Sequence, residues 1–195
     1  AAMAGMKIVV VKNLENGEID FEDFKAKTEQ HSENLSAIMI TYPSTYGFFD
    51  ANIKEITKLT HEHGGQVYMD GANMNAQVGF TSPGNIGADV CHLNLHKTFA
   101  IPHGGGGPGA GPVGCKDFLK EFLPIPVVEK NENGYYLNYD KEKTIGKMKD
   151  FYGHFGILVR GYTYCLSMGS DGLRKASELA VLNANYLAKL LKDDY

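Results

Sequence analysis

The sequence predicts an α/β fold in which a mostly parallel sheet is flanked by helices. Short apolar runs rich in β-branched residues are continuous rather than alternating, segments with helical spacing lie between them, and glycine or proline marks their junctions. Strands joined by helices form right-handed βαβ units, and continuous apolar strands are usual where helices cover both faces of a sheet. We therefore expect helices on both faces and a ligand site beyond the carboxyl ends of the strands.

The first elements alternate between strand and helix. Residues 8–11 form a β-branched run, which predicts a first strand, and Asp20 is placed as the N-cap of a helix over residues 21–31. Residues 37–41 predict a second buried strand. This strand should end before Pro43, because proline disfavours further extension.

The next helix and strand follow directly. Ile53, Ile56 and Leu59 share one face of a helix that glycines at 64–65 would close, and residues 66–69 predict the third strand. These elements continue the alternation on which the predicted fold rests.

The remaining chain contains a strand, a hairpin and a helix. Residues 90–95 predict the fourth strand, and residues 127–130 and 135–139 flank an Asn-Glu-Asn-Gly turn, which is a hairpin signal. Residues 171–191 have a helical apolar face.

The composition is that of a soluble enzyme segment with one domain or slightly more. The 195 residues are 43% hydrophobic and 22% charged, and a net charge of -4 gives no reason to expect nucleic acid or membrane as a partner. The three cysteines are scattered without a C-x-x-C spacing, which favours a reducing, cytoplasmic compartment over disulfides or a metal site. Residues 1–6 lack the features of a signal peptide and resemble a cut inside a domain.

Three features together indicate pyridoxal chemistry. Lys97 follows the expected strand at residues 90–95, a glycine run occupies positions 104–109, and Asp70 follows the strand at residues 66–69. A lysine at a strand end can form an imine with a carbonyl, while glycine N–H groups can bind a phosphate. An aldehyde that carries a phosphate is pyridoxal phosphate, and an aspartate beside its ring nitrogen would keep that nitrogen protonated.

Each feature also has a structural interpretation. Lys97 can be a lysine that reaches solvent from a strand end, and Asp70 can be a turn residue that bonds its own backbone. The glycine run can be a flexible linker; its formal G-x-G-x-x-G is interrupted by Pro108, which argues against dinucleotide binding.

The histidines are not expected to bind metal. His92 and His96 are four residues apart on a predicted strand rather than a helix, with no acid or cysteine at a suitable spacing. His61 and His63 are interpreted as favourable charges at a helix C-terminus and not as site residues.

Several runs resemble the P-protein family of the glycine cleavage system, the decarboxylating glycine dehydrogenases. The similarity extends over nearly the whole chain and is carried by residues 42–47, 70–79, 92–99, 104–109, 168–173 and 181–186. It implies part of the large domain of a fold-type-I pyridoxal-phosphate enzyme over residues 1–158. Connecting helices and the start of a small C-terminal domain would occupy residues 159–195.

The resemblance implies a role for each matched residue. Lys97 falls on the lysine that forms the Schiff base with pyridoxal phosphate, Asp70 on the acid that pairs with the pyridine nitrogen, and Ala72 on the small residue against the cofactor's face. Thr45 would lie near the ring hydroxyl.

Two more residues are implied near the phosphate. His96 and Asn94 would stand beside it, and the glycine run from Gly104 would contribute to a site across a subunit interface. The main phosphate anchor and the residue that stacks on the ring belong to sequence upstream of Ala1. We therefore expect the isolated chain to bind the cofactor weakly if at all.

The implied reaction is the decarboxylation of glycine with transfer of the aminomethyl group to the lipoyl arm of the H-protein. The implied partners are glycine, lipoylated H-protein, and a partner P-protein subunit or a second copy of the chain. Residues 123–152 resemble the bacterial form that is split into two subunits, of which the second carries the lysine. Two alternatives stay open: another pyridoxal enzyme similar to serine hydroxymethyltransferase, and a non-catalytic fragment that retains only the fold and the subunit interface.

Overall fold

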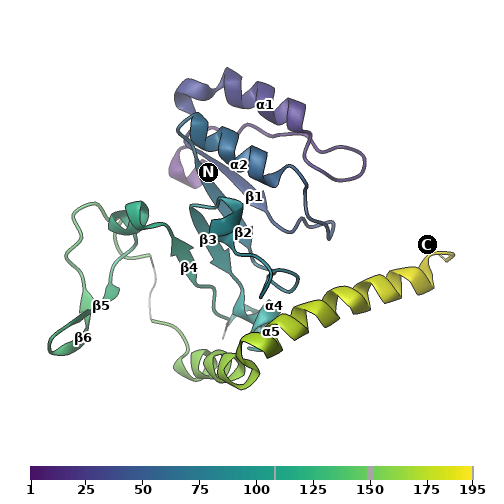
Figure 1. Ribbon diagram of the computed structural model, residues 1–195. Coiled ribbons are helices and arrows are strands. Elements are labelled where there is room, and N and C mark those ends of the chain that lie inside the picture. Colours follow the sequence, from purple (N-terminus) through teal and green to yellow (C-terminus); the bar gives the residue numbers. More distant parts are fainter. Residues whose placement is uncertain (108, 149–151, 195) are drawn as a thin grey trace.

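The computed structural model describes residues 1–107, 109–148 and 152–194, so Pro108 of the glycine run lies outside the described residues. Its centre is a 4-stranded sheet in the order β1-β2-β3-β4 (Figure 1). Strands β1 (Ala37–Thr41), β2 (Gln66–Gly71) and β3 (Val90–Leu93) are parallel, and β4 (Val113–Cys115) is antiparallel to β3. The predicted fold class is confirmed.

Two of the predicted helices are confirmed and cover one face of the sheet. Helix α1 (Phe21–Gln30) begins at Asp20, whose carboxylate accepts a hydrogen bond from the backbone N–H of Asp23 at 3.0 Å. Helix α2 (Ile53–Glu62) lies beside α1 over the same face (Figure 1), and the short helix α3 (Pro83–Ile86) follows β2. The core between helices and sheet is apolar and contains Phe24, Ile40, Ile53, Ile56, Val67, Met69, Ile86 and Cys91.

The other face of the sheet has no helical cover among the described residues, so the expectation of helices on both faces is wrong for this chain. Val67 and Met69 are each 1% exposed, whereas Tyr68 and Asp70, which alternate with them, are only half-buried. Met39, on the open face of β1, is 70% exposed. A continuous apolar run indicates that both faces of a strand can be buried. It does not indicate that helices of these 195 residues cover both faces.

The first predicted strand is also wrong. Residues 8–11 form no strand, and the only pairing nearby is a single bridge between Asn13 and Ile19. Ile8 and Val10 are 61% and 75% exposed, and the carbonyl of Val10 accepts a hydrogen bond from the side chain of Lys27 at 2.7 Å. A β-branched run needs a neighbouring strand for its hydrogen bonds, and propensity alone does not supply one.

Asp89, just before β3, joins the elements at the amino-terminal edge of the sheet. This carboxylate is 2% exposed at its side chain and lies 2.7 Å from Nε2 of His61, 2.8 Å from Nζ of Lys116 and 2.7 Å from the backbone N of Val67. Burial raises the pKa of Asp89, but these hydrogen bonds outweigh it and hold the pKa below its usual value. His61 lies in the last turn of α2, as expected, and its ring also pairs with Asp89, while Nδ1 of His63 lies 3.0 Å from the carbonyl of Leu59.

The C-terminal half extends away from the sheet. The predicted hairpin is confirmed as β5 (Val127–Asn131) paired with β6 (Gly134–Asn138), and it stands apart from the main sheet (Figure 1). Helix α5 (Phe155–Leu191) includes the predicted helical segment and has non-helical backbone angles at Gly169. Among the described residues, no helix combines the length and apolarity needed to cross a bilayer. Short 3₁₀ turns lie at Ala2–Ala4, Ser32–Asn34, Gly104–Gly106 and Asp117–Phe122.

Candidate active site at the carboxyl edge of the sheet

The carboxyl ends of the three parallel strands bring polar residues together. In the strand register, Asp70 lies between Thr41 of β1 and His92 of β3. Successive residues of a strand point to opposite faces, so these three side chains share the open face of the sheet. The predicted position of Asp70 at a strand tip is thus correct.

Hydrogen bonds join the loops that follow these strands. The buried Gln77 donates from Nε2 to the carbonyl of Tyr42 at 2.7 Å, which links the β2 loop to the β1 loop. The backbone N–H of Met74 donates to Oγ1 of Thr98 at 3.1 Å, which links the β2 loop to the segment after β3. The three loops therefore form one rim, although neither Gln77 nor Thr98 was expected in the site.

Asp70 is held by one hydrogen bond and one ion-pair contact, which end on the same oxygen. Its Oδ1 accepts the backbone N–H of Ala72 at 3.0 Å and lies 3.2 Å from Nε2 of His92. Among the described residues, Oδ2 has no hydrogen-bond partner and remains available as an acceptor. Asp70 is thus a turn residue, as the structural interpretation proposed, and it can also accept from a ligand.

His92 connects Asp70 to a phenol. Its Nδ1 lies 2.9 Å from the hydroxyl of Tyr68, and the two rings are 5.8 Å apart at their centroids. Burial raises the pKa of Tyr68, and the negative charge of Asp70 raises it further, so the phenol keeps its proton. His92 was considered from the sequence only as a metal ligand and rejected. The alternation of a strand places Tyr68 and Asp70 on one face, but pairing with His92 depends on the register between two strands.

Lys97 follows β3, as expected, but it lies on a short helix, and the strand expected over residues 90–95 ends two residues earlier. Strand β3 ends at Leu93, and helix α4 (Leu95–Thr98) begins after Asn94, whose carbonyl accepts the backbone N–H of Lys97 at 3.1 Å. The backbone of Leu95 donates to Ala110 instead of to a parallel neighbour, so the parallel ladder stops there.

A pocket of about 340 Å³ opens beside Lys97. Its walls come from α4, the loop after β2 and α5, with Val78, Leu173 and Ser177 among the lining residues. Lys97 itself is exposed, and its amine has no hydrogen-bond or ion-pair partner within the described part of the chain. Of the other expected site residues, only His96 lines this pocket.

His96 is neutral and incompletely bonded. Its Nδ1 is buried without a hydrogen-bond partner among the described residues, and its ring meets that of His103 edge-on, with centroids 4.5 Å apart. Desolvation lowers the pKa of His96, and the nearby charges of His103 and Lys97 lower it further. The imidazole therefore carries one proton at neutral pH and can donate to or accept from a ligand.

The remaining expected residues lie on the same rim without meeting in one cluster. Thr45 is exposed in the loop after β1, Ala72 is half-buried beside Asp70, and Asn94 precedes α4. The glycines at 104–106 form a 3₁₀ turn closed by the backbone bond from Gly107 to Gly104. The structure thus gathers Asp70 and Ala72 with His92, and places Lys97 with His96 at the adjoining pocket.

The rim has polar groups that lack protein partners. Four buried side-chain polar atoms without a hydrogen-bond partner occur among the described residues, and three belong to the rim loops: Oγ of Ser44, Oε1 of Gln77 and Nδ1 of His96. Buried polar atoms are almost always bonded, so this concentration fits a site that receives a polar ligand. A lysine amine and an aspartate carboxylate are the groups that proteins use to hold the aldehyde and the ring nitrogen of pyridoxal phosphate.

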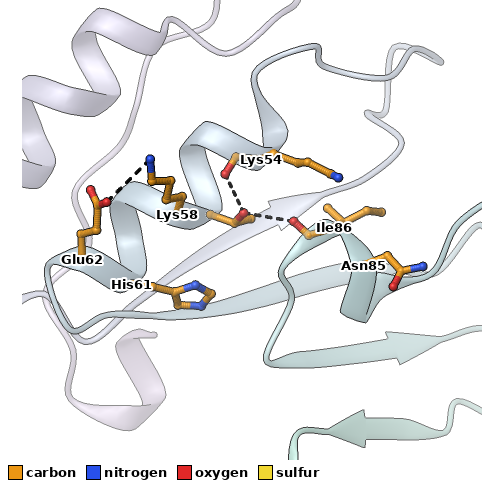
Figure 2. Close-up of a pocket in the computed structure, with 7 residues that line it drawn as sticks. Lys54, Lys58, His61, Glu62, Asn85 and Ile86 are labelled. Atoms are coloured by element: carbon orange, nitrogen blue, oxygen red, sulfur yellow. Dashed lines mark hydrogen bonds and ion pairs between the residues drawn. The ribbon is translucent and has the colours of Figure 1, made fainter.

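A second hollow lies elsewhere and does not have these properties. Figure 2 shows it between α2 and α3, where Lys54, Lys58 and His61 line an open surface. The hydroxyl of Thr57 donates to the carbonyls of Lys54 and Ile86, both at 3.0 Å, and so joins the two helices. Because His61 bonds Asp89 at the start of β3, this hollow belongs to the amino-terminal edge of the sheet, opposite the candidate site.

Comparison with known proteins gives consistent results. The family described as Glycine cleavage system P-protein matches residues 2–134. The chain is 52% identical over its whole length to a probable glycine dehydrogenase (decarboxylating) subunit 2 of Caldanaerobacter subterraneus, and 54% identical over 98% of its length to the protein of the same name from Pyrococcus abyssi. It spans 40% and 38% of these two relatives, or about two fifths of their length.

Solved structures share the fold. A cysteine desulfurase from Thermococcus onnurineus superimposes with a TM-score of 0.66 at 16% identity, covering 97% of this chain and 45% of that one. Mouse CSAD gives a TM-score of 0.67 at 20% identity, covering 98% of this chain and 41% of that one. At these identities the similarity concerns the fold alone.

Proposed function

Because this chain belongs to the glycine cleavage system P-protein family, we propose that the protein decarboxylates glycine with pyridoxal phosphate and transfers the aminomethyl group to the lipoyl arm of the H-protein. The observation that carries the proposal is the position of Asp70 and Lys97. Asp70 lies at the end of β2 and Lys97 follows the neighbouring parallel strand β3, and the hydrogen bond from Met74 to Thr98 joins the segments after these two strands. Ligands of open α/β sheets bind at this edge.

The residues on the rim fit the cofactor by chemical type. Lys97 would hold it covalently through its aldehyde carbon, and Oδ2 of Asp70 would accept from the ring nitrogen. Ala72 would lie against the ring and Thr45 near its hydroxyl, while His96 and Asn94 would face the phosphate. When bound, the cofactor supplies an electron sink for the charge that remains on the α-carbon of glycine after carbon dioxide leaves.

The chain's own groups would perform three tasks. The negative charge of Asp70 keeps a proton on the nitrogen opposite it, which sustains the electron sink. The amine of Lys97, which has no ion-pair partner among the described residues, would hold the cofactor's aldehyde carbon and would act beside the α-carbon of glycine. Apolar side chains from α5 and the β2 loop, including Leu173 and Val78, border the pocket and would limit the access of water.

The proposal extends to partners and location. The relatives from Caldanaerobacter subterraneus and Pyrococcus abyssi are both named as subunit 2. This supports a two-subunit P-protein in which this chain belongs to the lysine-bearing subunit. That subunit would assemble with a partner subunit or with a second copy. The three cysteines are free thiols, which is usual in the cytoplasm. The domain boundary near residue 158 and weak cofactor binding by the isolated 195-residue chain stay predictions.

The test is the glycine-dependent exchange of labelled bicarbonate, measured with the full-length protein and its partner subunit. We expect exchange that depends on pyridoxal phosphate and increases strongly with lipoylated H-protein, and we expect Lys97→Ala to abolish it. Lys58→Ala, which alters an exposed lysine on α2, serves as the matched control and should retain wild-type exchange. Full exchange by Lys97→Ala would contradict the proposal. A protein that interconverts serine and glycine as its main activity, without bicarbonate exchange, would contradict it as well.

A further inference from the structure

We propose that Tyr68 and His92 are positioning residues that orient the carboxylate of Asp70 through a chain of polar contacts across the open face of the sheet. The inference rests on the proposed function, since it concerns how Asp70 meets the cofactor ring. Neither residue lines the pocket beside Lys97, and both act through Asp70 rather than on the reacting atoms.

The contacts run from Tyr68 through His92 to Asp70. Tyr68 and Asp70 are two residues apart on β2 and therefore point to the same face, and His92 on β3 is the register partner of Asp70. The hydroxyl of Tyr68 is 2.9 Å from Nδ1, and Oδ1 of Asp70 is 3.2 Å from Nε2. A phenol that donates to Nδ1 leaves the proton of a neutral imidazole on Nε2, where it can be donated only to the carboxylate.

This arrangement leaves one carboxylate oxygen for the ligand. The backbone N–H of Ala72 donates to Oδ1, and Nε2 of His92 lies 3.2 Å from the same oxygen, so both hold this side of the carboxylate. Oδ2, which has no partner among the described residues, is then presented in one orientation. Orienting hydrogen bonds of this kind commonly change ligand affinity by about 10-fold to 100-fold where they support metal ligands.

The other face of β2 and β3 has no similar polar contacts beside Asp70 among the described residues. The opposite face of β2 and β3 holds Gly71 and Cys91, which are packed against each other and offer no comparable polar chain. Burial raises the pKa of the Cys91 thiol, so this neighbour stays neutral and does not compete for the proton of His92. On the face of Asp70, the contacts found are from His92 to the carboxylate and from Tyr68 to His92.

The first experiment reads the tautomer without cofactor or turnover. In the full-length protein with ¹⁵N-labelled histidine, the His92 ring should show the Nε2–H tautomer at neutral pH. Tyr68→Phe removes the donor to Nδ1 and should produce a mixture of tautomers. Tyr136→Phe is the matched control: its hydroxyl bonds Glu129 on the hairpin at 3.0 Å, and its loss should leave the His92 signals unchanged. An Nδ1–H tautomer in the wild type, or no change in Tyr68→Phe, would overturn the proposal.

The second experiment measures cofactor affinity by absorbance titration with two substitutions of opposite character. His92→Gln places an amide N–H near the position of Nε2 and should bind pyridoxal phosphate nearly as well as the wild type. His92→Asn places its amide near Nδ1 and cannot reach Asp70, so we expect affinity to fall by about tenfold. Equal affinity in the two variants would contradict a positioning role, because a purely structural role would not separate them.

The two proposals fail in different ways. If the wild-type protein shows no absorbance band that depends on Lys97, the proposed function fails. The tautomer of His92 still tests the contacts from Tyr68 through His92 to Asp70 in that case. If the wild type binds the cofactor and both His92 variants bind it equally well, the positioning role alone fails.

Discussion

The replacement of Gly71 by alanine tests whether the packing between β2 and β3 sets the position of Asp70. The backbone of Gly71 does not have a positive φ, so glycine is required here for space rather than for conformation. A Cβ at this position would lie 2.5 Å from Sγ of Cys91 and 3.0 Å from the carbonyl oxygen of His92. Overpacking of this kind costs about 1–3 kcal/mol, and the strand must shift at the residue that follows Asp70.

A second substitution separates the two contacts. Cys91→Ala removes Sγ and should by itself cost about 1 kcal/mol through the small cavity that it leaves. In the double variant the closest contact is gone, while the contact with the His92 carbonyl remains. The double variant should therefore be more stable than the sum of the two single effects predicts, by about 1 kcal/mol or more, without full recovery.

The assay is thermal and urea unfolding of the full-length variants, followed by titration with pyridoxal phosphate. Gly84→Ala is the control: it lies in α3, and a Cβ there meets nothing within 4 Å, so stability should be unchanged or rise by up to about 1 kcal/mol. Wild-type stability of Gly71→Ala would refute the reasoning. So would additive effects in the double variant, because they would show that Cys91 and residue 71 do not meet.

Three further outcomes follow from other contacts. The pKa of Asp89 is lower in the folded protein than its usual value of 3.8. The ionised carboxylate therefore stabilises the fold above pH 3.8, and this stabilisation is lost as the pH falls through the folded pKa. In urea unfolding, Asp89→Asn should reduce the free energy of unfolding at pH 7 by about 1–3 kcal/mol, and by less at pH 3. The hydrogen bond from Lys141 is the main reason that the pKa of Glu129 is about 2, so Lys141→Met should raise it towards 4.5 in an NMR titration. Gln77→Leu leaves the carbonyl of Tyr42 without its donor, and both stability, by about 1–3 kcal/mol, and cofactor affinity should decrease in the same unfolding and titration assays.

Local patterns were sufficient for the elements that the chain forms by itself. Asp20 followed by an acidic first turn predicted the start of α1, and the spacing of Ile53 and Ile56 predicted the buried face of α2. The hairpin followed from the Asn-Glu-Asn-Gly signal at residues 131–134, where Asn131 pairs with Gly134 and residues 132–133 make the turn. In each case the signal and the stabilising contacts lie within a few residues, so no knowledge of distant neighbours was needed.

Patterns failed where the outcome depends on a distant partner. Residues 8–11 have strong strand propensity but no strand beside them, and Met39 belongs to a strand whose second face is open. His61 was assigned to its own helix, yet its partner is Asp89, 28 residues away. The end of β3 was misplaced by two residues because the apolar run continues into the first residue of α4, and periodicity cannot distinguish a strand end from a buried helix start over so short a segment.

The candidate site was predictable to the extent that strand tips determine it. Asp70 and Lys97 could be placed at the carboxyl edge of the sheet because each lies at or after the end of an apolar run. The parallel order of β1, β2 and β3 then brings these two segments together. The relation of His92 to Asp70 could not be found in this way, because it requires the register between β2 and β3, and a shift of one residue would point His92 to the opposite face.

That dependence on register links the stability of the sheet to the proposed chemistry. Asp89 bonds the backbone of Val67 and so fixes the start of β3 against the start of β2. Three residues further along each strand, Asp70 and His92 meet as register partners. In a variant that loses the contact between Asp89 and Val67, we expect β3 to shift against β2. The shift should lengthen the distance between Nε2 of His92 and Oδ1 of Asp70 at the carboxyl ends of the strands. The contacts at the amino-terminal edge of the sheet therefore help to set the orientation of the carboxylate that would receive the cofactor's nitrogen at the other edge.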